Sequence, residues 1–239
     1  YSGGYAGPLT LEQAVAQSTN TVAVRLADEV GRPNVAATAK RLGIVSPVNT
    51  DPAMALGTSL VSPLEMAQAY AAFGNGGERV QAYGVERIRT VGGQVLYQRK
   101  ASPAQAVIAN PALSDLNRML RGVVASGTGT RAAIAGYDLA GKTGTTSDYK
   151  DAWFAGFTGG FTAVVWMGND SGAPMKRVTG GAAPAELWRG FMVSALKRAP
   201  ARPIPPGPPP PEPAQSIDTL LEAEPENLPP AEIVDEPPI

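Results

Sequence analysis

Proline is concentrated at the C-terminal end of this chain, and that distribution limits the folded part to the residues before it. Fourteen of the 23 prolines lie in residues 200–239, which include the run PIPPGPPPPEP. The same segment holds eight of the 21 acidic residues and one basic residue, Arg202. Such a segment cannot bury enough apolar surface to offset the entropy lost on ordering. We therefore predict a folded unit over residues 1–199 and an extended, disordered Pro/Glu-rich tail over residues 200–239.

The chain contains no histidine and no cysteine, which narrows the chemistry open to it. A Ser-His-Asp triad, a Cys-His pair and a histidine-ligated metal are impossible within it, so proton transfer falls to Lys, Ser, Asp, Glu or Tyr. No metal, cofactor or nucleic-acid partner is predicted, and no run of 18 apolar residues indicates a membrane span. Residues 1–199 keep 19 basic and 13 acidic residues, a net charge of +6 that suits an anionic substrate.

The order of patterns along residues 1–199 predicts helices first and strands later. Two short runs flank Gly92-Gly93 and indicate a β-hairpin over residues 85–98. In the last helix we expect Leu187, Phe191 and Leu196 to lie near one apolar face. The order predicts an α+β fold with an antiparallel sheet rather than a βαβ alternation. The helical patterns occupy residues 8–31, 32–44, 62–77, 110–127 and 183–199, and the strand patterns occupy residues 139–146, 151–160 and 161–170.

The string GKTGTT at residues 141–146 is open to two interpretations. Read back to Gly136, the residues GYDLAGKT satisfy the G-x-x-x-x-G-K-[ST] pattern of a nucleotide-binding P-loop. A P-loop needs a helix that begins at its Lys-Thr, because the helix N-terminus helps to hold the phosphates. Gly144 follows Lys142-Thr143 directly, and the next long patterns are strand-like. Nucleotide binding by a P-loop NTPase is therefore kept only as an outside alternative.

The second interpretation places Lys142 on a strand edge, with its ammonium group facing a cleft. Thr143 and Thr145 point to one side because side chains alternate along a strand. The small Gly144 lets a substrate backbone lie close to the strand. Two hydroxyls and a cation on one strip make a good carboxylate receptor. Taken alone, K-T-G also fits an ordinary surface strand.

Ser18 and Asn20 form an S-x-N pattern in the polar break QSTN between two helical segments. Taken alone, this pattern is typical of capping chemistry. Together, however, S-x-N and a later K-T-G are two of the three motifs of serine acylases, and S-x-x-K is the third.

Longer segments support this second interpretation, and over about residues 1–192 the sequence resembles the C-terminal part of the transpeptidase domain of a class A (bifunctional) penicillin-binding protein. The resemblance implies the α+β fold of serine β-lactamases and penicillin-binding proteins, in which helices flank an antiparallel sheet. Here that fold is expected to be incomplete at the N-terminus. The segments that carry the resemblance are GPLTLEQAVAQSTNTVAVRLADEVG, ALGTSLVSPLEMAQAYAAFGNGG, VVASGTGTRAA, AGKTGTTSDYKDAWFAGFTGGFTAVVWMGND and VTGGAAPAELWRGFM.

The resemblance also implies an activity, D,D-transpeptidation of peptidoglycan at the periplasmic face of the inner membrane. A serine is acylated by a stem peptide ending in D-Ala-D-Ala, the last D-Ala leaves, and the amine of a second strand takes the acyl group. Penicillins imitate the donor and stay attached. The expected partners are therefore stem peptides and β-lactams.

Roles for individual residues follow from the resemblance alone. Ser18 is expected to shuttle protons toward the departing amine, and Asn20 to bind the donor amide and orient the lysine. Lys142 would hold Ser18 and supply positive potential. Thr143 and Thr145 would bind the substrate carboxylate, and the Thr145 N–H would be one oxyanion-hole donor.

One expected motif is missing. S-x-x-K matches occur only after K-T-G, at Ser147 to Lys150 and at Ser194 to Lys197, whereas the family places its nucleophile before S-x-N. We therefore expect the nucleophile, its lysine, the rest of the domain, the glycosyltransferase domain and the membrane anchor to lie upstream of Tyr1. The chain alone is then expected to be inactive. The alternatives are a penicillin-binding sensor or scaffold without turnover, and a serine β-lactamase or D,D-carboxypeptidase.

Overall fold

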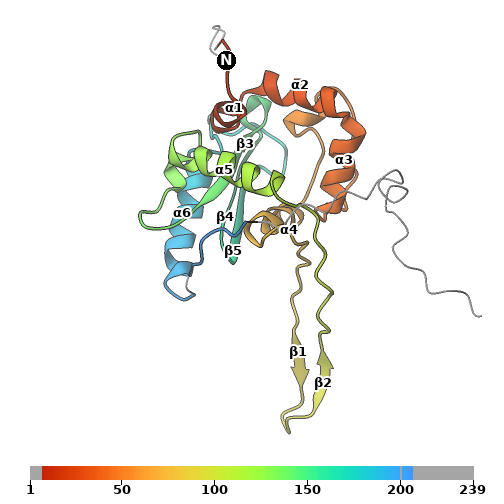
Figure 1. The fold of residues 1–239 in the computed structure, drawn as a ribbon. Coiled ribbons are helices and arrows are strands. Elements are labelled where there is room, and N and C mark those ends of the chain that lie inside the picture. Colours follow the sequence, from red (N-terminus) through yellow and green to blue (C-terminus); the bar gives the residue numbers. More distant parts are fainter. Residues whose placement is uncertain (1–6, 200, 207–239) are drawn as a thin grey trace, which may run out of the picture.

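The structure, a computed structural model, describes residues 7–199 and 201–206. Within this part of the chain the main sheet is antiparallel, with the strand order β3-β4-β5 (Figure 1). Helices pack against β3, β4 and β5, which confirms the predicted α+β fold with an antiparallel sheet flanked by helices. The strands of this sheet are β3 (Ala140–Thr145), β4 (Asp151–Thr158) and β5 (Phe161–Gly168).

The predicted helices also form, and two of them begin with a capping box. The Thr10 side chain accepts the N–H of Gln13, and the Ser62 side chain accepts the N–H of Glu65. In each case the third helical residue reaches back to the cap, which satisfies two N–H groups at once. No helix in the described ranges is long and apolar enough to cross a membrane. The helices are α1 (Leu11–Gln17), α2 (Asn20–Val30), α3 (Arg32–Arg41), α4 (Pro63–Gly74), α5 (Ala112–Ala125) and α6 (Ala183–Leu196), with short 3₁₀ turns at Met54–Leu56, Thr130–Ala132 and Ser147–Tyr149.

Strand β4 divides the interior into two apolar cores, because its side chains alternate between the faces of the sheet. Phe154 packs on one face against Trp188 of α6, with the ring centroids 5.2 Å apart. Phe157 packs on the other face against Phe73 of α4 and the apolar side of α5. Both phenylalanines are fully buried. The two cores fix β3 and β4 firmly between helices.

The apolar face predicted for α6 is partly wrong. Leu196 is buried as expected, but Leu187 and Phe191 are 54% and 55% exposed. The buried stripe instead runs through Trp188, Met192 and Leu196, spaced four residues apart. The two stripes share Leu196 and are otherwise one residue apart on the helix, and packing against the sheet buries the one that contains Trp188. The Trp188 Nε1–H donates to a carbonyl oxygen of β5 at 3.0 Å, which satisfies its polar atom inside the core.

The predicted hairpin forms from β1 (Arg87–Arg89) and β2 (Val95–Gln98). It is part of a longer two-stranded arm, residues 78–106, that projects from the body of the domain (Figure 1). Gly93 in the tip has φ 87°, a backbone conformation that residues with side chains rarely adopt. This explains why a glycine pair marks the turn.

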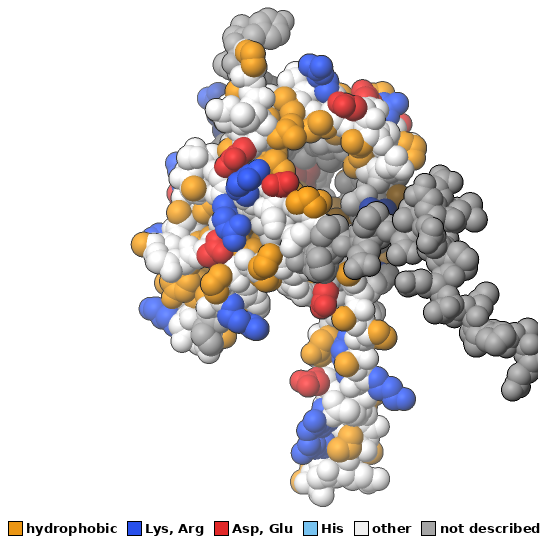
Figure 2. Space-filling model, in the orientation of Figure 1, with side chains coloured by type: hydrophobic (Ala, Val, Ile, Leu, Met, Phe, Trp, Pro, Cys, Tyr) orange, Lys and Arg blue, Asp and Glu red, His pale blue; other side chains and the backbone are white. Residues whose placement is uncertain are grey.

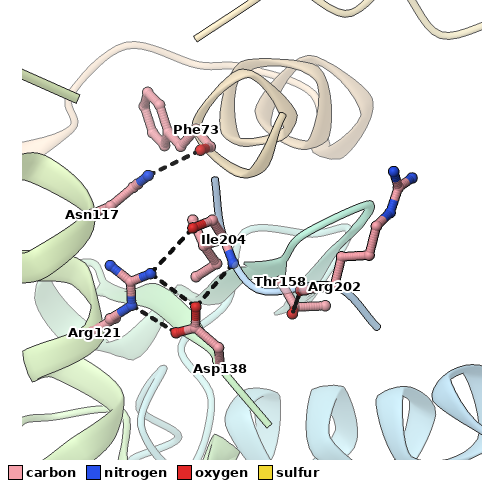
Figure 3. A network of polar contacts seen from close by, with 7 residues as sticks. All are labelled: Phe73, Asn117, Arg121, Asp138, Thr158, Arg202 and Ile204. Carbon is pink, nitrogen blue, oxygen red and sulfur yellow. Dashed lines mark hydrogen bonds and ion pairs between the residues drawn. The ribbon is translucent and has the colours of Figure 1, made fainter. Parts of the chain in front are cut away.

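Residues 201–206, which their proline content assigned to the tail, pack against the domain (Figure 3). The Ile204 side chain is buried in the core that contains α5 residues. The Asp138 carboxylate accepts the Ile204 N–H at 2.9 Å and pairs with the Arg121 guanidinium at 2.6 and 2.8 Å. This pairing lowers the pKa of Asp138. The packed part of the chain thus reaches Pro206, and the rest of the predicted tail, residues 207–239, lies outside the described residues.

Candidate active site

Ser18 lies at the break between α1 and α2, and its hydroxyl contacts β3. Its backbone is left-handed, with φ 56°, which is uncommon for a residue other than glycine. The Ser18 N–H still caps α1 by donating to the carbonyls of Ala14 and Val15. Lys142 of β3 donates from Nζ to Ser18 Oγ at 2.7 Å, although 124 residues separate the two in sequence. The fold therefore brings two of the predicted catalytic residues into direct contact.

Lys142 is a half-buried cation. Its Nζ also donates to the Thr143 carbonyl at 3.1 Å, and within the described residues no carboxylate forms an ion pair with it. Burial lowers the pKa of Lys142 from 10.5 to about 8, because the charged form loses hydration without gaining an opposite charge. At neutral pH Lys142 is mostly protonated, but it holds its proton less tightly than an exposed lysine does. The pair can thus hold and exchange a proton at Ser18 Oγ.

The next residue of β3, Thr143, is held by the loop that follows α5. The hydroxyl oxygens of Thr143 and Thr128 lie 2.7 Å apart. The Thr128 N–H donates at 3.0 Å to the carbonyl of Ala16, near the end of α1. A Cβ atom added at Gly127 would stand 2.3 Å from that same carbonyl oxygen, so only glycine permits the approach. In the sequence, SGTGT stands out only as part of the family resemblance. Its glycine spacing is the signal from which this contact could have been predicted.

Thr145, at the end of β3, is held from another direction. Its hydroxyl oxygen accepts the N–H of Gly180 at 3.0 Å. A Cβ atom at Gly180 would lie 2.2 Å from the Trp153 carbonyl oxygen and 2.5 Å from that of Gly144. A Cβ atom at Gly144 would stand 3.2 Å from the Cβ of Trp153. The glycines of VTGG and K-T-G therefore pack closely inside the protein, a contact that sequence reasoning missed.

Asn20 is the first residue of α2, and its side chain is exposed. Within residues 7–199 and 201–206 it donates no hydrogen bond to Ser18 or Lys142. Asn20 therefore lies two residues after Ser18 in the chain, but no hydrogen bond in the described part of the chain connects its side chain to Lys142. Its predicted role remains a prediction.

Two other patterns are resolved by their surroundings. Strand β3 continues through Lys142 and Thr143, so the helix that a P-loop needs does not begin there. Ser194, of the S-x-x-K match at residues 194–197, lies on α6 with its hydroxyl 3.4 Å from the Gly190 carbonyl oxygen of the same helix. In the described part of the chain, no group of three or more acidic side chains gathers as a metal site.

Comparison with known proteins decides the family. Residues 2–189 match the family described as "Penicillin binding protein transpeptidase domain". The chain belongs to this family. Penicillin-binding protein 1A of Pseudomonas aeruginosa is 30% identical over 257 residues, covering 85% of this chain and 31% of the relative. The chain therefore spans less than a third of that relative. The resemblance to penicillin-binding proteins seen in the sequence is confirmed.

Solved structures of penicillin-binding transpeptidases share the fold of this chain. The crystal structure of penicillin-binding protein 1A from Haemophilus influenzae superimposes with a TM-score of 0.77 at 26% identity, over 86% of this chain and 37% of that one. The PonA1 protein from Mycobacterium tuberculosis, in complex with penicillin V, gives a TM-score of 0.75 at 26% identity, over 87% of this chain and 64% of that one. Ser18 and Lys142 lie in the S-x-N and K-T-G patterns of this chain.

Proposed function

We propose that this chain is the C-terminal portion of a serine-type D,D-transpeptidase that cross-links peptidoglycan stem peptides. The observation that supports the proposal most directly is the 2.7 Å contact between Lys142 Nζ and Ser18 Oγ. It unites S-x-N and K-T-G, the two serine-acylase motifs present, at one point of the molecule. A half-buried lysine beside a serine hydroxyl suits proton transfer in a protein that has no histidine.

The reaction proceeds in two acyl transfers. A serine oxygen attacks the carbonyl between the two D-alanines, the carbon–nitrogen bond breaks, and the leaving D-Ala amine takes a proton. The acceptor amine then attacks the ester, and the serine recovers its proton as the cross-link forms. Division into two steps replaces one difficult exchange by two easier ones. The nucleophilic serine belongs to a segment outside this chain.

Each residue of the site has a role in this scheme. Ser18 passes the proton toward the leaving amine, and Lys142 holds Ser18 and supplies positive potential. Thr143 and Thr145 bind the terminal carboxylate, and the Thr145 N–H donates to the oxyanion. Asn20 binds the donor amide. Loss of one oxyanion donor typically costs about 10²–10³ in rate.

The same site accounts for β-lactam binding, since a β-lactam presents a carboxylate beside a reactive carbonyl. PonA1, which shares the fold of this chain, was solved with penicillin V bound. Because the proposed substrate is peptidoglycan, we place the site at the periplasmic face of the inner membrane.

Acylation kinetics of the full gene product test the proposal. Ser18→Ala is expected to reduce the rate of penicillin acylation by about 10² or more, because it removes the proton shuttle. Ser194→Ala, which alters the S-x-x-K match in α6, is the matched control and should leave the rate unchanged. Equal rates for wild type and Ser18→Ala would refute the assigned role. Rapid release of the acyl group would favour a β-lactamase or carboxypeptidase, and stable acylation without cross-linking would favour a sensor.

A further inference from the structure

The arm formed by residues 78–106 is unusual because apolar side chains are exposed on both of its strands. Every residue of β1 and β2 is exposed. A two-stranded hairpin is marginally stable in water, and exposed apolar clusters of this kind commonly mark a contact surface. The exposed large apolar side chains of the arm are those of Tyr83, Val85, Ile88, Val91, Val95, Leu96 and Tyr97.

The arm is also basic. It carries five basic and two acidic residues, a net charge of +3. Figure 2 shows Lys and Arg side chains interleaved with hydrophobic ones along it. Arg99 lies over the Tyr83 ring at 4.0 Å, and Arg87 donates to Gln98. In the described ranges, however, no ion pair includes any of its basic residues, which are Arg79, Arg87, Arg89, Arg99 and Lys100.

The last described residues, Pro205 and Pro206, lie at the root of this arm. A Cβ atom added at Gly76 would lie 3.6 Å from the Pro206 carbonyl oxygen and 3.8 Å from Cγ of Pro205. Two residues after Gly76, Glu78 begins the arm by bridging to Ala106. The exit is fixed in place, because the Ile204 backbone is held by Asp138 and Arg121 (Figure 3).

The segment that follows this exit has the opposite charge. Residues 207–239 contain no basic residue, and their apolar residues include Ile217, Leu220 and Leu221. Their eight acidic residues are Glu212, Asp218, Glu222, Glu224, Glu226, Glu232, Asp235 and Glu236.

We propose that the acidic segment 207–239 docks along the basic, apolar arm of the same chain. Opposite charges lie on two parts of one chain that meet at a fixed point, and the arm's exposed apolar groups offer the segment a surface to cover. The arm is about 45 Å long at 3.3 Å per residue, whereas 33 residues can span roughly 100 Å, so the segment can reach the tip. Tethering at the root gives an effective concentration on the order of millimolar, so even weak local affinity favours docking.

Hydrogen exchange of the arm amides in the full gene product tests this proposal. In one variant the eight acidic residues of segment 207–239 are replaced by Gln or Asn, which leaves the described residues of the domain unchanged. At low ionic strength the arm amides of the wild type should exchange about tenfold more slowly than those of the variant. The difference should shrink in 0.5 M salt, where charges are screened within a few ångströms.

A second pair of variants alters the arm instead. Arg89→Gln with Lys100→Gln removes two arm cations that make no described hydrogen bond, and should abolish most of the protection. Arg25→Gln with Lys40→Gln removes two exposed charges from α2 and α3, and should leave it intact. Equal exchange in wild type and the neutralised segment would overturn the proposal. Protection that depends on protein concentration would overturn it in favour of a second copy, and protection that appears only with an added protein in favour of a separate partner.

Discussion

Lys142 holds its ammonium group half-buried beside Ser18, with no carboxylate in ion-pairing distance among the described residues. This arrangement opposes stability, because burial lowers the pKa of Lys142 to about 8. The unfolded chain therefore binds a proton more tightly at this position than the folded chain. Between pH 8 and 10.5 stability must rise with pH, since the unfolded state holds the extra proton. Such a costly group is more readily explained by chemistry than by folding.

Replacement of Lys142 separates its cost to stability from its role in the chemistry. Lys142→Met is expected to raise the free energy of unfolding at pH 7 by about 1–2 kcal/mol, since a buried charge is removed. The same variant of the full gene product should lose penicillin acylation. Unfolding by urea at pH 7 and pH 10 measures the first effect, and the gain should shrink at pH 10. Lys40→Met, at an exposed position of α3, is the control, and a destabilised Lys142→Met protein would contradict the argument.

At the scale of single elements, helix and strand positions could be predicted from local signals, whereas the buried face of α6 could not. The caps at Thr10 and Ser62 and the turn at Gly92-Gly93 act within a few residues, so the sequence carries them directly. On α6 two apolar stripes lie side by side, and the residues that each stripe would contact decide which of them is buried. Only the packed sheet, with Phe154 opposite Trp188, decides between them.

Neighbouring residues of α6 test that distinction. Met192→Ala is expected to lower the free energy of unfolding by about 2–4 kcal/mol, because it leaves a cavity in a fully buried site. Phe191→Ala, one residue away and 55% exposed, should cost less than about 1 kcal/mol. Chemical denaturation of both variants gives the comparison. A larger loss for Phe191→Ala would mean that the predicted face, not the observed one, is buried.

At the scale of the whole molecule, the site depends on contacts between segments far apart in sequence. Ser18 and Lys142 meet only because α1, α5 and β3 pack together, which no local pattern encodes. The family resemblance anticipated this meeting, whereas the residue patterns alone left it open. Residues 201–206 show the reverse case. Their proline content predicted a tail, but one buried isoleucine and the Arg121–Asp138 pair hold them against the core.

Ile204 tests whether this C-terminal segment stabilises the domain. Ile204→Ala is expected to lower the free energy of unfolding by about 2–4 kcal/mol. The Ile204 side chain is only 5% exposed, so its truncation leaves a cavity in the core that contains α5 residues. Val45→Ala, at an 81% exposed position, is the control and should change stability little. Thermal unfolding measures both. If Ile204→Ala matched the control, residues 201–206 would not contribute to the fold.

We propose that this chain supplies the Ser18–Lys142 part of a penicillin-reactive site whose nucleophile lies in a segment outside it. The most direct test is labelling with a fluorescent penicillin, carried out on the full gene product and on the 239-residue chain alone. We expect a stable label on the full product and none on the chain. A stable label on the chain alone, or no label on either, would contradict it.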